Sequence, residues 1–268
     1  MPVRGLLLDV EGVLVGDKRY AAVATAVGFV RGARAADCPL RLITNNTTDD
    51  RPTIVSKLTQ AGFDFSLEEV LTCTGAAVER LRAAGARRCL VLGTTALRGM
   101  FVDAGFEIAD DKDVDAVVVG FDTELTYARL QTACDAVLTH GATLLALHHN
   151  RLLIDAAGRL APSVGAIVAS IEYATQVEAI IVGKPSADYF RMGLTGLGVP
   201  AADVLMVSDD PLTDLVGAKR LGMKTAFALS GKYADRAVLE HVPEAGRPDI
   251  VVARVGDLLT EGRVTFTG

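Results

Sequence analysis

The chain has 268 residues, of which 50% are hydrophobic and 22% are charged, a composition typical of a folded globular protein and not of a disordered one. Its formal net charge of -6 argues against a surface that attracts nucleic acid or anionic lipid. No apolar run approaches the ~20 residues that a transmembrane helix needs. We therefore expect neither a nucleic-acid partner nor a membrane partner.

The cysteines are widely spaced and show no C-x-x-C pattern: Cys38, Cys73, Cys89 and Cys134. This spacing predicts buried, reduced thiols and not disulfides or zinc ligands. The opening segment "MPVRGLLLDVEG" is interrupted by acids too early to resemble a secretory signal. The sequence thus predicts a soluble cytoplasmic protein, and it leaves a homodimer open.

Short apolar runs alternate with helix-period segments along the chain. The runs that predict strands cover residues 5–9, 40–45, 89–93, 115–120, 143–147, 179–183, 204–208 and 225–229. Most are continuously apolar, as expected for parallel strands buried on both faces. Helix-period apolar residues lie between them, at Ile54, Leu58 and Ala61 and at Leu130, Ala133 and Val137. The alternation predicts an α/β fold with a mainly parallel sheet.

Polar residues follow several of these strands. Asp9 ends the first strand, Thr44 and Asn45 end the second, Lys184 follows the run 179–183, and Asp209 follows the run 204–208. In open α/β sheets the carboxyl ends of the strands border the ligand crevice. Strands that end in this way favour a single site assembled from distant parts of the sequence.

The interval between Thr44 and Lys184 is several times longer than the ~30 residues of one βαβ unit. It contains strand–helix repeats of its own. The simplest interpretation is a second α/β domain, residues 74–180, inserted as a cap into a core of residues 1–73 and 181–268.

The segment "SDDPLTD" places Asp209, Asp210 and Asp214 around the start of a helix. Magnesium takes oxygen ligands and often keeps several waters and substrate phosphate oxygens. Asp209 is the best direct ligand, and Asp214 would hold a metal-bound water or orient Lys184. Alternatively, Asp210 and Asp214 are ordinary acids at a helix N-terminus, where they are stabilising by themselves.

Lys184 would relieve the repulsion among these carboxylates and bind phosphate as a point charge. Alternatively, it is a surface lysine whose apolar stem packs on the protein. Thr44, with Asn45 and Asn46, would offer a hydroxyl, amides and backbone N–H groups to phosphate oxygens. The alternative here is a polar turn that caps the helix beginning near Asp50.

Together these segments resemble the haloacid dehalogenase superfamily. Its phosphatases carry, in fixed order, a D-x-D-G-type strand end, a Thr/Ser strand end, a lysine and an acidic segment, which here read "LLLDVEGVL", "LITNN", "VGKPSADYF" and "SDDPLTD". The chain is most similar to the 4-nitrophenylphosphatase-like and ribonucleotide-monophosphatase-like group with a large α/β cap. The segments "RLAPSVGAIVASIEYATQVEAIIVGKPSADYF" and "LSGKY" look most like the phospholysine phosphohistidine inorganic pyrophosphate phosphatase group.

The resemblance implies a Rossmann-like core and a site held at its strand ends. Asp9 would be the nucleophile that forms an aspartyl-phosphate. Magnesium would be held by Asp9, the backbone carbonyl of Glu11 and Asp209, and Asp214 would support this metal shell. Gly12 would let the chain turn sharply beside the phosphate.

The same resemblance assigns the phosphate-binding groups. Thr44, Asn45 and Lys184 would bind the transferring phosphoryl group, whose transfer depends on positioning and charge stabilisation.

Glu11 departs from the family pattern, because these phosphatases usually have aspartate at this position as the general acid and base. Glutamate has nearly the same unperturbed pKa but is one methylene longer. Three interpretations remain open: Glu11 does the same work with an adjusted backbone, it works poorly and suits substrates with good leaving groups such as acyl-phosphates or phosphoramidates, or it points away. Ser208, where glycine is common, is a second departure from which we expect little.

Substrate choice would come from the cap, where the candidates are the segment 121–127 and His148, Asn150 and Arg151, with His149 between them. The alternative is a solvated loop. Lys232 and Tyr233 are candidates that approach from the core.

The leading hypothesis is a magnesium-dependent phosphohydrolase that acts on a small phosphorylated molecule. A metal-independent dehalogenase would also use a nucleophilic aspartate, but Asp209 and Asp214 argue against it. A catalytically weakened ligand-binding or interaction protein is the third hypothesis. The joint presence of Asp9, Thr44 and Lys184 with these acids argues against complete loss of activity.

Overall fold

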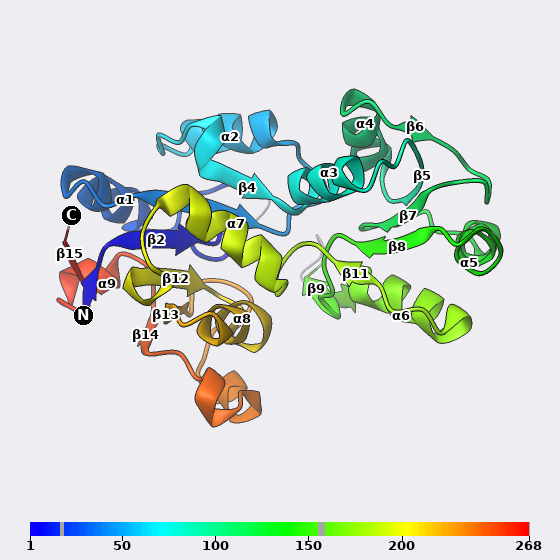
Figure 1. Ribbon diagram of the computed structural model, residues 1–268. Coiled ribbons are helices and arrows are strands. Elements are labelled where there is room, and N and C mark those ends of the chain that lie inside the picture. Colours follow the sequence, from blue (N-terminus) through cyan, green and yellow to red (C-terminus); the bar gives the residue numbers. More distant parts are fainter. Residues whose placement is uncertain (17–18, 155–158, 268) are drawn as a thin grey trace. The chain divides into compact units, whose positions relative to one another are not determined.

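The computed structural model describes residues 1–16, 19–154 and 159–267 (Figure 1). The chain divides into two compact units. The first unit comprises Met1–Thr44, Arg51–Leu71 and Pro185–Gly268, and the second comprises Asn45–Asp50 and Thr72–Lys184. The second unit begins and ends within a few residues of the segment expected to form a cap, and it also includes residues 45–50, which were expected in the core. That it acts as a cap stays a prediction.

The first unit is built on a six-stranded sheet in the order β14-β13-β12-β2-β3-β4. These strands are β2 (Gly5–Leu8), β3 (Leu40–Thr44), β4 (Val70–Thr72), β12 (Val204–Ser208), β13 (Lys224–Ala228) and β14 (Ile250–Val252). From β14 to β3, each neighbouring pair is parallel. Since parallel strands share one carboxyl edge, the segments that follow β13, β12, β2 and β3 meet there.

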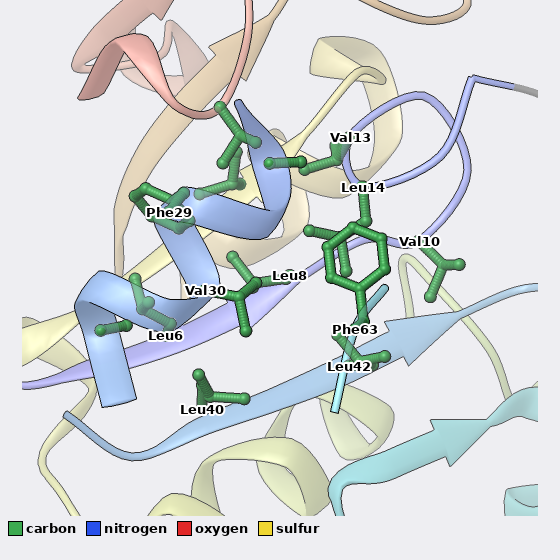
Figure 2. Close-up of a cluster of buried hydrophobic side chains, with 14 of the residues drawn as sticks. Leu6, Leu8, Val10, Val13, Leu14, Phe29, Val30, Leu40, Leu42 and Phe63 are labelled. Atoms are coloured by element: carbon green, nitrogen blue, oxygen red, sulfur yellow. The ribbon is translucent and has the colours of Figure 1, made fainter. Parts of the chain in front are cut away.

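Strand β2 is central and is covered on both faces, which explains its uninterrupted leucines. Leu6 and Leu8 belong to a core cluster with Phe29 and Val30 of α1 (Ala26–Ala35), as Figure 2 shows. Leu7 points to the opposite face, where α7 (Ala187–Leu197) packs closely enough that a Cβ on Gly193 would lie 3.0 Å from a Leu7 methyl group. All three leucines are fully buried, and each such side chain contributes about 1.5–3 kcal/mol by leaving water.

The second unit has a five-stranded sheet in the order β11-β8-β7-β5-β6, whose neighbouring strands are parallel. Its strands are β5 (Arg88–Leu92), β6 (Glu107–Ile108), β7 (Ala116–Val119), β8 (Thr143–Ala146) and β11 (Ile180–Ile181). Its helices are α3 (Cys73–Ala83), α4 (Thr95–Asp103), α5 (Tyr127–His140) and α6 (Val164–Thr175). Strands β9 (Leu152–Ile154) and β10 (Leu160–Pro162) form a separate antiparallel pair.

Shorter elements complete the first unit. Strands β1 (Pro2–Val3) and β15 (Thr265–Phe266) pair in parallel and join the two ends of the chain. The helices are α2 (Arg51–Gln60), α8 (Val216–Arg220), α9 (Asp257–Thr260) and a π-helix, η3 (Pro211–Leu215). The 3₁₀ turns are η1 (Leu67–Glu69), η2 (Ala201–Asp203), η4 (Ala237–His241) and η5 (Glu244–Gly246).

The predicted α/β fold with mainly parallel sheets is confirmed, and every run expected to be a strand contains one. Two expectations need correction. The helix with Ile54 and Leu58 ends at Gln60, before Ala61. Strand β11, which precedes Lys184, pairs with β8 in the second unit and not with the sheet that carries Asp9. An apolar run indicates burial, but it does not say which sheet the strand joins.

The cysteines are free and buried, as predicted. Burial raises the pKa of the Cys38 thiol to about 11 and that of Cys73 to about 12, so these thiols stay protonated at neutral pH. None of the helices in the described ranges combines the length and apolar character that crossing a membrane requires.

Candidate active site

The acidic centre of the first unit lies where β2 and β12 end side by side. Asp9 follows β2, and its backbone N–H donates to the carbonyl of Val207 in β12 across 3.0 Å. Asp209 follows β12 directly. The two residues are only 8% and 9% exposed, so the fold holds two carboxylates close together in a poorly solvated place. The structure thus brings together the two acids that the sequence analysis proposed as nucleophile and metal ligand.

Ser208 links this pair to a third acid. Its Oγ lies 2.7 Å from Oδ2 of Asp214 and 3.3 Å from Oδ2 of Asp9, and it accepts a hydrogen bond from the N–H of Asp210 at 3.1 Å. Because a hydroxyl has a single hydrogen, it can donate to only one of the two carboxylates at a time. The serine from which little was expected therefore connects the carboxylates of Asp9 and Asp214.

The two remaining acids of "SDDPLTD" differ in role. Asp210 caps η3, because its Oδ1 accepts from the N–H groups of Leu212 and Thr213, so the ordinary helix-terminal interpretation holds for it. Asp214 lies inside η3, is buried, and bonds to Ser208 and to the Thr213 hydroxyl. π-Helical turns are rare in proteins, but those that occur are often found at functional sites.

Asp209 is enclosed on one side by backbone. Its Oδ2 accepts the N–H of Lys232 at 2.6 Å, and a Cβ added at either Gly12 or Gly231 would overlap this oxygen. Burial, followed by the charge of Asp9, raises the pKa of Asp209 to about 8. The described residues give Oδ1 of Asp209 no hydrogen bond, so this oxygen is left for an outside ligand.

These features fit a magnesium ion. The carboxylates of Asp9 and Asp209 are hard oxygen donors, and a divalent cation would offset the repulsion that raises the pKa of Asp209. Within the described ranges, no three His, Cys, Asp or Glu side chains form a group that would hold a metal by themselves. Magnesium often relies on one or two carboxylates and completes its shell with water or phosphate oxygens.

A tight turn follows Asp9. The N–H groups of Leu14 and Val15 donate to the carbonyl of Val10, and the N–H of Gly12 donates to the carbonyl of Val15 at 2.7 Å. Gly12 has φ 80°, a left-handed conformation that a side chain would strain. Glu11 stands at the start of this turn and is half-buried. Its role as general acid and base stays a prediction.

Thr44 ends β3 at the same edge of the sheet and is 3% exposed. Its backbone carbonyl lies 2.7 Å from the hydroxyl of the buried Tyr189, which also reaches the carbonyl of Leu71. Tyr189 of α7 therefore fixes the strand end that carries the Thr44 side chain.

Lys184 and Asn45 belong to the second unit and are bonded to each other. The side-chain oxygen of Asn45 accepts the Lys184 N–H at 2.8 Å, and its side-chain nitrogen donates to the Lys184 carbonyl at 3.0 Å. Lys184 is 2% exposed, so it is not the surface lysine of the alternative interpretation. Asn46 forms a polar turn, because its Oδ1 accepts from the N–H groups of Thr48 and Asp49; that this turn caps the following helix stays a prediction.

The proposed substrate-reading residues of the second unit differ in burial and in hydrogen bonding. His148 is buried, and its Nδ1 accepts the N–H of Asn150 at 3.3 Å. A neutral His148 ring that accepts at Nδ1 carries its proton on Nε2. The described residues give no hydrogen-bond partner to the buried Oδ1 of Asn150. Arg151 is exposed, and Nε2 of His149 lies 3.9 Å from Oε2 of Glu172.

The segment 121–127 was a substrate-reading candidate, but one of its two acids, Asp122, holds the structure of the loop. The buried carboxylate of Asp122 accepts from Arg129 at 2.6 Å and from the N–H of Glu124 at 2.9 Å. Thr126 caps α5 through the N–H of Arg129. These residues shape the loop before α5, and periodicity alone could not separate this role from binding.

Ser230 is not among the site residues predicted from the sequence, and Ser208 contributes more than predicted. The hydroxyl of Ser230 donates to the Gly12 carbonyl at 2.6 Å. A signal was present, since "SGK" follows an apolar strand directly and its glycine suggests a close approach of backbone.

Comparisons with known proteins identify the family of this chain. Residues 6–107 match the family model described as haloacid dehalogenase-like hydrolase, and residues 181–258 match a second model of the same kind. The chain is 31% identical over 265 residues to the phospholysine phosphohistidine inorganic pyrophosphate phosphatase of Homo sapiens, covering 97% of this chain and 95% of that protein.

Solved structures give the same result. A p-nitrophenyl phosphatase from Archaeoglobus fulgidus matches with a TM-score of 0.87 at 25% identity, covering 97% of this chain and 100% of that one. A 4-nitrophenylphosphatase from Thermotoga maritima matches with a TM-score of 0.85 at 28% identity, covering 96% and 97%. The chain therefore belongs to the haloacid dehalogenase-like hydrolases, within the group of their phosphatases.

Proposed function

We propose that this phosphatase is magnesium-dependent and hydrolyses small phosphorylated molecules through a covalent intermediate on Asp9. The observation that carries the proposal is the buried acidic centre, in which Asp9 is joined to Asp214 through Ser208 beside the enclosed carboxylate of Asp209. A structural role alone gives no reason to bury these acids together, because each buried carboxylate costs several kcal/mol unless it is compensated.

The chemistry follows from the residues. An Asp9 carboxylate oxygen attacks phosphorus, the bond from phosphorus to the leaving group breaks, and an aspartyl-phosphate forms. Water then attacks phosphorus, which releases inorganic phosphate and regenerates Asp9. A bound magnesium ion, held by Asp9, Asp209 and the carbonyl of Glu11 with support from Asp214, would shield negative charge between nucleophile and substrate.

Glu11 is assigned the proton transfers. It would protonate the leaving group in the first step and remove a proton from water in the second. Its extra methylene relative to aspartate favours substrates whose leaving groups depend less on protonation by the enzyme. Phosphoramidates and acyl-phosphates have this property, and the name of the human relative includes phospholysine and phosphohistidine, which are phosphoramidates.

The phosphoryl group would be bound by Thr44 and Lys184, with Asn45 holding the main chain at Lys184. The second unit would act as the cap, where His148, Asn150 and Arg151 would read the leaving group. A cytoplasmic location and a homodimer remain predictions from the sequence.

The test is hydrolysis of 4-nitrophenyl phosphate with and without magnesium by the wild type and by Asp9→Asn. We expect magnesium-dependent turnover in the wild type and none above background in Asp9→Asn, with unchanged circular dichroism. Chloride release from a 2-chloro acid without metal would support the dehalogenase instead. A folded wild type that is inert on a broad panel of phosphates, including phosphoramidates, would support the binding protein.

A further inference from the structure

The loop that follows β13 touches both acidic segments of the first unit. We propose that Ser230–Lys232 is a positioning element that fixes the Asp209 carboxylate and the turn at Gly12 in their reactive arrangement. This inference rests on the proposed function, since it assigns a role in the same reaction.

Three hydrogen bonds connect this loop to its neighbours. The Ser230 hydroxyl donates to the Gly12 carbonyl at 2.6 Å, the Lys232 N–H donates to Oδ2 of Asp209 at 2.6 Å, and Nζ of Lys232 donates to Asp210 at 2.8 Å. Each bond ends on a different residue of the segments that follow β2 and β12. The loop therefore couples the turn after the nucleophile to the acidic segment.

Gly231 is what allows this close approach. A Cβ at this position would overlap Oδ2 of Asp209 and lie 2.5 Å from the Cα of Gly12. The segments that follow β2, β12 and β13 thus meet around Oδ2 of Asp209, and glycines at 12 and 231 leave room for this approach. Any larger residue at 231 would push the loop away from Asp209.

The consequence concerns the oxygens available to a ligand. With Oδ2 held by the Lys232 N–H, the carboxylate of Asp209 cannot rotate freely, and Oδ1 keeps one direction. The peptide between Glu11 and Gly12 is planar, so the Gly12 N–H bond to Val15 fixes the direction of the Glu11 carbonyl. Ser230 fixes the next peptide through the Gly12 carbonyl. Hydrogen bonds therefore orient two proposed metal-binding oxygens: Oδ1 of Asp209, through the Lys232 N–H, and the Glu11 carbonyl, through the Gly12 N–H.

Lys232 adds a charge to this arrangement. Burial alone lowers the pKa of its ammonium group, but the charge of Asp210 and the hydrogen bond to it outweigh burial and raise that pKa above its usual value. The lysine therefore stays protonated and anchors the loop to the residue that caps η3.

The test compares Ser230→Ala with Ser230→Thr and with the control Ser170→Ala. Ser170 also donates from a partly buried hydroxyl to a backbone carbonyl, that of Ile167 in α6, far from Asp209 in the sequence. The readouts are magnesium affinity, from calorimetric titration without substrate, and kcat for 4-nitrophenyl phosphate.

We expect Ser230→Ala to weaken magnesium binding and to lower kcat, each by about tenfold, because one hydrogen bond that orients the turn is lost. Ser230→Thr keeps the hydroxyl and should restore both values. Ser170→Ala should change neither, although it loses a comparable hydrogen bond. Gly231→Ala should weaken magnesium binding more than Ser230→Ala does.

Equal magnesium affinity and equal kcat in folded Ser230→Ala and wild type would overturn the inference. A parallel loss in Ser170→Ala would also overturn it, since the effect would then be general destabilisation. The proposed function fails separately: a wild type that binds magnesium but hydrolyses no phosphate would contradict it, while weaker binding in Ser230→Ala would still support the positioning role.

Discussion

The hydroxyl of Ser208 lies 2.7 Å from the carboxylate of Asp214 and so ties the last residue of β12 to the π-helix that follows it. The same oxygen is 3.3 Å from the carboxylate of Asp9. A fully buried serine at the end of a strand thus connects the proposed nucleophile with an acid six residues further along the chain.

Removing this hydroxyl should be costly. We expect Ser208→Ala to lower the free energy of unfolding by about 1–3 kcal/mol, because buried carboxylates lose a hydrogen bond. It should also lower kcat about tenfold by loosening Asp9. Urea unfolding and 4-nitrophenyl phosphate hydrolysis measure the two effects. Ser163→Ala is the control, since Ser163 is also buried but makes no capping hydrogen bond to α6. Similar losses in both variants would contradict the connection.

Glu11 should be required when the leaving group is poor. We expect Glu11→Ala to lower kcat/KM, which reports the step in which the leaving group departs, by ~10²–10⁴-fold for an alkyl phosphate and much less for 4-nitrophenyl phosphate, whose leaving group needs no proton. Glu11→Asp should exceed the wild type on the alkyl phosphate. Equal activity of Glu11→Ala and wild type on both substrates would show that Glu11 points away from the reaction.

Magnesium should reverse a pH-dependent loss of stability. The pKa of Asp209 is raised to about 8 in the folded protein by burial and by Asp9, whereas it is about 3.9 in an unfolded chain. The folded state therefore keeps a proton that the unfolded state loses, so this stabilisation is full below the unfolded pKa and is lost as pH rises through the folded pKa.

The Tm of the metal-free protein should accordingly fall between about pH 4 and about pH 8, and added magnesium should restore most of it at the upper end. Asp209→Asn should flatten the pH dependence and remove the response to magnesium. Asp188→Asn is the matched control, because Asp188 is exposed. A Tm that is unchanged by magnesium at every pH would contradict the proposed site.

Asn45 should act through Lys184. Asn45→Ala removes both hydrogen bonds to the Lys184 backbone, so we expect about tenfold weaker inhibition by inorganic phosphate and a lower kcat. Asn45→Asp keeps an acceptor for the Lys184 N–H, and it should fall between Ala and wild type in phosphate inhibition. Unchanged inhibition in Asn45→Ala would mean that these bonds only support the fold.

Arg129 should matter for stability and not for chemistry. Its partner Asp122 has a side chain only 1% exposed, so Arg129→Ala leaves a buried carboxylate without its cation and should cost about 3 kcal/mol in urea unfolding. Arg191→Ala breaks an ion pair whose side chains are 60% and 77% exposed, and it should cost less than about 1 kcal/mol. A selective change in KM with unchanged stability would restore segment 121–127 as a substrate-reading loop.

The sequence by itself determined the features that depend on local pattern. Continuous apolar runs predicted buried parallel strands, and acids placed directly after them predicted that Asp9 and Asp209 share one edge of a sheet. These predictions succeed because burial on both faces of a strand leaves a periodic trace in the chain, and because parallel strands must end at the same edge.

Only the tertiary structure decided how those ends are held. Which sheet β11 joins, the bond from Ser208 to Asp214, and the approach of Gly231 to Asp209 all depend on contacts between segments far apart in the chain. A serine or a glycine carries no local sign of its distant partner, because its hydrogen bonds and close contacts are set by strand register and packing. The residue types were visible in the sequence, but their partners came from the fold.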